Sequence, residues 1–162
     1  MTKKIKKYIS INIFFVSIFF CVLFSYNNSV YAALEPIMVK DVNAIQSGGV
    51  SGLTSYNGEV IFTAYDDYKG YELWKSDGTQ DGTLMIKDIR EGLTGSGPAN
   101  LIVFDENVFF TANNGTNGTE LWKSDGTEVG TVMVKDIRVG SLSSSPANFY
   151  VLGSTLYFVA TD

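Results

Sequence analysis

Histidine is absent from this chain of 162 residues, and cysteine occurs only once, at Cys21. Histidine is the commonest general base and the commonest metal ligand, so its absence excludes most familiar hydrolase and metalloenzyme sites. A single cysteine can form neither an intramolecular disulfide nor a thiolate metal site. We therefore expect no catalytic residue and no resident cofactor, and the one alternative is calcium bound by carboxylates.

Positive charge is concentrated at the start of the chain, in Lys3, Lys4, Lys6 and Lys7. An apolar run from Ile11 to Phe24 follows, and small residues precede Ala32. This order predicts a secretory signal peptide over residues 1–32, cleaved after Ala32. The 14-residue run is shorter than the roughly 20 residues of a membrane-spanning helix, so we expect no integral membrane span after cleavage. The localisation predicted is extracellular, cell-surface or periplasmic.

The predicted mature chain, residues 33–162, is strongly acidic. Removing four lysines from 12 basic residues leaves 8 against 17 acidic ones, a net charge of −9. Phosphate backbones attract the opposite sign, so no nucleic-acid partner is expected.

An internal repeat of 48 residues dominates the mature chain. Glu72–Asn100 and Glu120–Asn148 align without a gap and are identical at 20 of 29 positions. A partial copy, Ile37–Val42, precedes them, and Phe149–Ala160 repeats Leu101–Ala112. A fixed period of this length indicates a stacked array of supersecondary units.

Each unit carries four strand signals separated by turn residues. In one unit they are Leu101–Phe104, Val108–Ala112, Glu120–Ser124 and Thr131–Ile137. In the preceding unit Asn57-Gly58 predicts a two-residue hairpin turn. Runs such as Val108-Phe109-Phe110 are apolar on both strand faces, as expected for a sheet covered on both sides. We predict an all-β fold of tandem four-stranded antiparallel blades, a partial β-propeller. A β-sandwich or a solenoid of the same hairpins is the rival fold.

The third and fourth strands predict a register. If residues 77–82 form the hairpin loop, Ser76 faces Thr83, Trp74 faces Met85 and Glu72 faces Lys87. The next unit repeats these pairs as Ser124 with Thr131, Trp122 with Met133 and Glu120 with Lys135.

The DGT elements at Asp77-Gly78-Thr79 and Asp125-Gly126-Thr127 predict tight turns, because Asp can bond the amides of its own turn. A calcium loop is the alternative. Asp77, Asp81 and Asp88 occupy positions 1, 5 and 12 of the calcium-loop spacing. The second copy has Val129 in place of Asp81, and no helix flanks either loop.

A Lys-Asp pair recurs at 40–41, 87–88 and 135–136. Its interpretation here is a cross-strand ion pair with a strand-end cap, and the alternative is a ring of Asp side chains in a central channel that binds a cation or a sugar. Asn114 and Asn117 match the N-glycosylation pattern, which more simply describes a polar loop.

The corresponding loop of the earlier unit is the one contact patch that the sequence predicts. Its aromatic and acidic side chains suit a carbohydrate or protein ligand. They are Tyr65, Asp66, Asp67, Tyr68 and Tyr71.

The motif ELWKSDGT, followed by GT and KDI, resembles the bacterial ELWxxDGT repeat, also labelled hyalin-like. The resemblance extends from Ile37 to Asp162. It implies a propeller-like array outside the cytoplasm, and it carries no catalytic residue to transfer. The hairpin turn also resembles the Asp-box of sialidase-type propellers, which is a structural turn.

The pattern ends at Thr161-Asp162, after the second strand of a further unit. This predicts an incomplete propeller whose exposed blade faces favour self-association, or closure of a ring by several copies. The function expected is a non-catalytic exported binding or adhesion module. The alternatives are a fragment of a secreted propeller enzyme acting on glycans and a truncated remnant without function.

Overall fold

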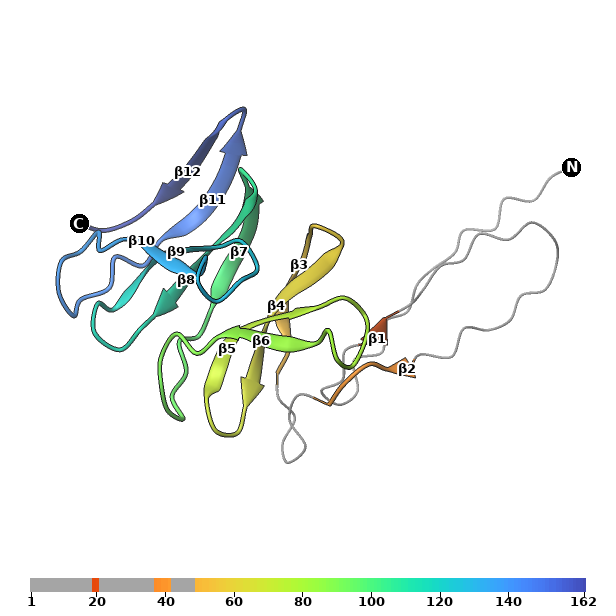
Figure 1. Cartoon of the computed structure of the whole chain (residues 1–162). Coiled ribbons are helices and arrows are strands. Elements are labelled where there is room, and N and C mark those ends of the chain that lie inside the picture. The colour runs from red at the N-terminus through yellow and green to blue at the C-terminus, as the bar shows by residue number, and fades with distance from the viewer. Residues whose placement is uncertain (1–18, 21–36, 42–48) are drawn as a thin grey trace, which may run out of the picture.

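The computed structural model describes residues 19–20, 37–41 and 49–162, and this part of the chain contains twelve β-strands and no helix (Figure 1). The predicted all-β class is therefore confirmed. The predicted signal peptide lies outside the described residues except for Phe19–Phe20, which forms β1 and pairs with β2 (Ile37–Met38).

Two four-stranded antiparallel sheets and one two-stranded sheet follow in sequence order, as the repeat predicts. The first sheet contains β3 (Ser51–Tyr56), β4 (Glu59–Asp66), β5 (Gly70–Ser76) and β6 (Leu84–Lys87). The second contains β7 (Ala99–Phe104), β8 (Asn107–Asn113), β9 (Thr119–Ser124) and β10 (Val132–Lys135). The third contains β11 (Ala147–Leu152) and β12 (Thr155–Val159).

The first hairpin of each four-stranded sheet has the same backbone. Asn57 and Gly58 have φ of 48° and 82°, and Asp105 and Glu106 have φ of 47° and 56°. Positive φ at both central residues matches the twist of a two-residue hairpin, so this predicted turn is confirmed. A bulge in the first strand also recurs, with positive φ at Gly52, Asn100 and Asn148.

Consecutive sheets stack face to face, and an apolar core lies between the first two. The first sheet and the segment after it contribute Tyr56, Ile61, Leu73, Ile86 and Ile89, and the second sheet contributes Val108, Phe110, Ala112 and Trp122. The opposite face of the first sheet forms another cluster of Phe62, Ala64 and Trp74, covered by Val39 and Val50. Strand β4 is apolar on both sides because its sheet is covered on both faces, by the second sheet on one and by Val39 and Val50 on the other.

The two tryptophans occupy equivalent surroundings in their sheets. Trp74 lies opposite Phe62, Trp122 lies opposite Phe110, and each tryptophan residue is 6% exposed. Val39, from the partial copy before the first sheet, packs against the cluster that contains Trp74. Ile86, at the equivalent position of the first unit, packs in the same way against the cluster that contains Trp122. Stacking of like units is thus repeated within the chain.

The sheets approach most closely at their first strands, with β3 beside β7 and β7 beside β11. The fourth strands, β6 and β10, lie at the opposite edges of their sheets (Figure 1).

Two of the three predicted cross-strand pairs are confirmed in each unit, and one is wrong. Trp74 pairs with Met85, and the Ser76 hydroxyl lies 2.6 Å from that of Thr83. Glu72 does not face Lys87, because a bulge at Ile86 moves Lys87 opposite Leu73. The second unit has the same bulge at Val134, which places Lys135 opposite Leu121 rather than Glu120.

Candidate functional site

Both DGT elements form tight turns, as predicted. The Asp77 carboxylate accepts hydrogen bonds from the Thr79 amide at 2.8 Å and the Thr79 hydroxyl at 2.7 Å. Asp125 and Thr127 repeat these contacts at 2.9 and 2.7 Å. The hydrogen bonds from Thr79 and Thr127 lower the pKa of Asp77 and of Asp125 below the ordinary value. Each turn holds its Asp as an ionised structural group.

The three calcium candidates are not brought together as a metal-binding group. Asp77 and Asp81 lie in the β5–β6 loop, whereas Asp88 follows β6 and forms an ion pair with Lys69 at 3.3 Å. Among the residues that the structure describes, no group of three or more Asp, Glu, His or Cys side chains is placed to hold a metal ion.

Lys87 and Lys135 do not face the Glu of their own unit across the sheet. The Lys87 ammonium crosses to the second sheet and donates to the Thr131 carbonyl at 2.9 Å. Lys40 makes the equivalent bond to the Thr83 carbonyl, at 2.7 Å. Asp88 and Asp136 follow the fourth strands, at the sheet edge remote from the closely spaced first strands. The lysines therefore connect consecutive units.

Glu72 and Glu120, which begin the ELW motif, are fully buried. Oε1 of Glu72 accepts from the amides of Arg90 at 3.2 Å and Ser96 at 2.8 Å. Its Oε2 accepts from the Ile89 amide at 3.2 Å and the Ser96 hydroxyl at 2.6 Å. Burial outweighs these bonds and raises the pKa of Glu72 above its ordinary value.

Glu120 repeats this arrangement in the second unit, where it accepts from the Ile137 amide at 3.0 Å and from the amide and hydroxyl of Ser144 at 2.9 and 2.6 Å. We name each set, a buried Glu with the two segments that it bonds, a glutamate clamp. The sequence prediction placed these carboxylates in surface ion pairs. The recurrence of Ser96 and Ser144 at the same distance from each Glu is the signal that could have identified the clamp.

The loops at one end of the sheets form a surface that we name the loop end, comprising residues 65–71, 88–98, 113–119 and 136–146. The β4–β5 loop meets the segment after β6 there, through the Lys69–Asp88 ion pair. In the second unit the side-chain amide of Asn117 donates to the Asp136 carboxylate at 2.8 Å instead. The loop end therefore keeps its geometry while its side chains change.

The structure brings together part of the predicted contact patch. The rings of Tyr65 and Tyr71 lie edge to face, with centroids 5.1 Å apart. Asp66 caps its own loop, accepting from the amides of Tyr68 at 2.8 Å and Lys69 at 3.1 Å. Tyr68 is 76% exposed, and Tyr71 is also exposed. The patch therefore offers aromatic rings rather than paired carboxylates.

An open groove of about 510 Å³ lies between the loop ends of the first two units. One wall is residues 88–91 and the other is residues 114–116. Its lining is polar and includes the charged side chains of Asp88, Arg90 and Glu91. The sequence prediction missed this groove, because neither wall is recognisable until the stacking of two units is known.

Among the described residues, no helix has the length and apolar character needed to cross a membrane. No protein-family model, curated protein or solved structure matches the chain.

Proposed function

We propose that this chain is part of an exported repeat module of the β-propeller type, resembling the ELWxxDGT repeat, that binds a carbohydrate or protein ligand at its loop end and performs no catalysis. Stacked four-stranded antiparallel sheets of one repeating sequence support the propeller assignment. The signal pattern in residues 1–32 supports export.

The observation that carries the proposal is where the two complete units differ. The stacking motif ELWKSDGT and the later KDIR and PAN elements are identical in both. The loop end differs: Tyr65-Asp66-Asp67-Tyr68 corresponds to Asn113-Asn114-Gly115-Thr116, and residues 91–97 differ from 139–145 at five of seven positions. A constant scaffold with variable surface loops is typical of binding proteins.

Exposure at the loop end favours the same function. Large apolar side chains stand open to solvent there although the stacked core is close by, and they are Tyr68, Tyr71, Leu93, Val139 and Leu142. Apolar side chains among polar ones are what a ligand-binding surface requires. The carboxylates of Asp66, Asp77, Asp125, Glu72 and Glu120 are engaged in turns and clamps, which favours binding over acid–base chemistry.

The test is a glycan-array and cell-surface binding screen with the full chain and the Tyr68→Ala variant. Loss of an exposed aromatic contact should weaken binding at least tenfold and leave thermal stability unchanged. Tyr150→Ala is the matched control, because Tyr150 is exposed on β11, outside the loop end. Equal binding by wild type and Tyr68→Ala would contradict the proposed site, and turnover of any glycan would contradict the non-catalytic assignment.

A further inference from the structure

The strand β12 has one free edge within the described part of the chain. It pairs only with β11, whereas its counterparts β4 and β8 pair on both sides. A free edge presents a row of unpaired amides and carbonyls. The sequence of β12, Thr155–Val159, contains no charge and no proline, the features that usually protect such an edge.

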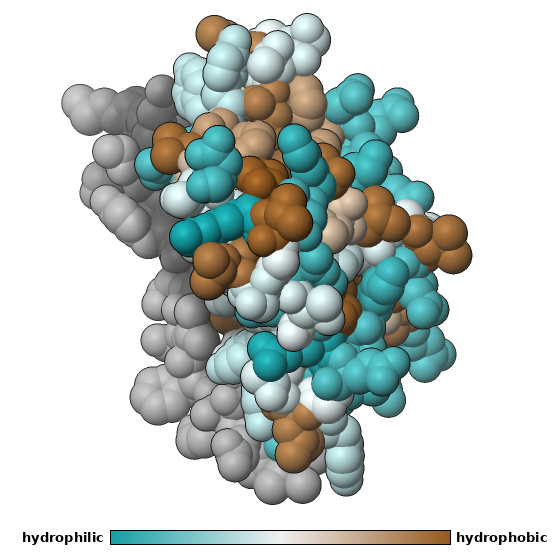
Figure 2. Space-filling view, turned by 90° about the vertical axis from the view of Figure 1, so that its left-hand side faces the viewer, coloured by the Kyte–Doolittle hydropathy of each residue, from teal (hydrophilic) through white to brown (hydrophobic). Residues whose placement is uncertain are grey.

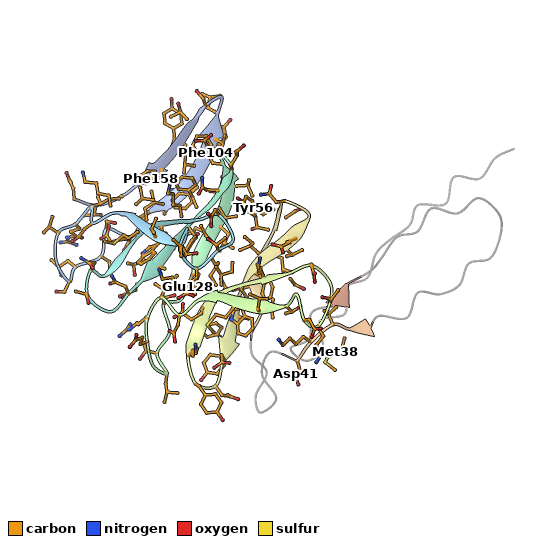
Figure 3. The ribbon with its side chains drawn as sticks, in the orientation of Figure 1. Met38, Asp41, Tyr56, Phe104, Glu128 and Phe158 are labelled. Carbon is orange, nitrogen blue, oxygen red and sulfur yellow. The ribbon has the colours of Figure 1, made fainter. Side chains whose placement is uncertain are left out.

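Side chains around this edge are exposed where their counterparts are buried. Phe158 is 37% exposed, and the equivalent Phe110 is 0% exposed. Val134, on the adjacent face of the second sheet, is 45% exposed, and the equivalent Ile86 is 5% exposed. Figure 2 shows apolar side chains gathered over this side of the molecule, and Figure 3 places Phe158 on its hairpin.

The same chain shows twice what covers an edge and a face of this kind. The strand ELWKS of β5 pairs with β4, and that of β9 pairs with β8, with Trp opposite Phe in both sheets. The DGT hairpin that follows each strand accepts a hydrogen bond from a lysine of the preceding unit. Lys40 donates to the Thr83 carbonyl, and Lys87 donates to the Thr131 carbonyl. Lys135 is the next lysine in this series, and it is exposed.

From this continuity with the interfaces inside the chain, we propose that the β12 edge and Lys135 form a docking site for an ELWKSDGT strand and hairpin supplied by a polypeptide that carries the same repeat. The incoming strand adds antiparallel to β12, with its Trp opposite Phe158 and its Glu opposite Ala160. A carbonyl of its hairpin accepts a hydrogen bond from the Lys135 ammonium group. The main-chain ladder provides affinity, and the Trp and Glu positions provide specificity.

A second copy of this chain is a weaker occupant. Its ELWKS strands, β5 and β9, are each paired on both sides within their own sheets. The strands at its sheet edges, β12 among them, lack the Trp that covers the equivalent Phe in the other two sheets. The inference rests on the repeat architecture in the proposed function, but not on the ligand at the loop end.

The experiment titrates the full chain into a fluorescently labelled peptide with the sequence of residues 119–148 and follows its anisotropy. We expect saturable binding, together with slower amide exchange along β12. Lys135→Met should weaken binding about tenfold, because it removes one charged hydrogen-bond donor and keeps the aliphatic stem. Lys40→Met is the matched control, since that lysine is already engaged with Thr83, and it should bind the peptide as wild type does.

A peptide carrying Trp122→Ala should bind at least a hundredfold more weakly, because a large buried ring is lost. Absence of binding, or binding that leaves β12 exchange and the Lys135→Met affinity unchanged, would overturn the proposal. Dimerisation of the chain through β12 that the peptide cannot compete with would overturn it in favour of a second copy. Peptide binding that persists in Tyr68→Ala separates this site from the loop end.

Discussion

Replacing Glu72 by glutamine tests the glutamate clamp most directly, because the two side chains have nearly the same shape. The amide NH₂ must stand where one carboxylate oxygen accepts hydrogen bonds. If the NH₂ group took the Oε1 position, it would face two other hydrogen-bond donors, the backbone amides of Arg90 and Ser96. In the Oε2 position it opposes the Ile89 amide and the Ser96 hydroxyl, and that hydroxyl can rotate to accept. Glutamine therefore takes the second orientation.

That orientation leaves one buried amide, that of Ile89, without an acceptor. The cost of a buried unsatisfied donor is about 1–3 kcal/mol. Glu120→Gln should cost about the same, because its Oε2 is likewise shared by a backbone amide, that of Ile137, and a serine hydroxyl. The two sites lie in separate sheets, so the double variant should lose the sum to within about 0.5 kcal/mol.

The assay is urea denaturation followed by the fluorescence of Trp74 and Trp122. Glu91→Gln is the matched control, because Glu91 is exposed and should change the free energy of unfolding by less than about 0.5 kcal/mol. If Glu72→Gln proves no more costly than Glu91→Gln, the clamp does not stabilise the fold and the reasoning is refuted.

Three further predictions concern the same scaffold. Burial raises the pKa of Glu72 above 4.5, so this carboxyl ionises at lower pH in the unfolded chain than in the folded one. The free energy of unfolding should therefore fall as the pH rises from about 4.5 to the raised pKa. Glu72→Gln should flatten that slope in pH-dependent urea denaturation, and an unchanged slope would contradict the assignment. Tyr56→Phe removes the 2.5 Å hydrogen bond from the hydroxyl to the Glu106 carbonyl of the next sheet and should lower the melting temperature, at a cost of about 1 kcal/mol, whereas Tyr150→Phe, at an exposed position, should not. Gly82→Ala would place a methyl group 2.0 Å from the Asp77 carboxylate and should break the turn, lowering the urea midpoint well below that of Asp81→Ala; equal midpoints would show that the turn adapts.

The repeat made most of the fold predictable. Identical sequence at a fixed spacing implies identical local structure, so one hairpin identified at Asn57-Gly58 located the others. Apolar residues on both faces of β4 and β8 indicated sheets covered on both sides, and the structure shows that stacking. The pairing of Trp74 with Met85 followed from the loop length alone.

The role of the ELW glutamate was not predictable by the same reasoning. Strand alternation assigns Glu72 a partner two residues beyond Met85, but the bulge at Ile86 shifts that partner by one position. A bulge leaves no simple mark in a short β-branched or apolar strand. The true partners, Ile89, Arg90 and Ser96, lie in a loop after the sheet, where periodicity carries no information.

The candidate site was predicted in part for a related reason. Tyr65 and Tyr71 meet because a hairpin loop joins their strands, which sequence proximity indicates. The groove between residues 88–91 and 114–116 depends on how far apart two stacked sheets lie. The sequence pattern of a single strand contains no information on that separation.

Each glutamate clamp also determines how stiffly one unit is joined to the next. The segment from Asp88 to Pro98 contains glycines with positive φ at 92, 95 and 97, a composition that would otherwise make a pliable tether. A single carboxylate grips this segment near its start, at Ile89, and near its finish, at Ser96. A force that pulls two units apart would have to break the hydrogen bonds of the buried glutamate before it could extend this segment. Neighbouring units should therefore move as one rigid body.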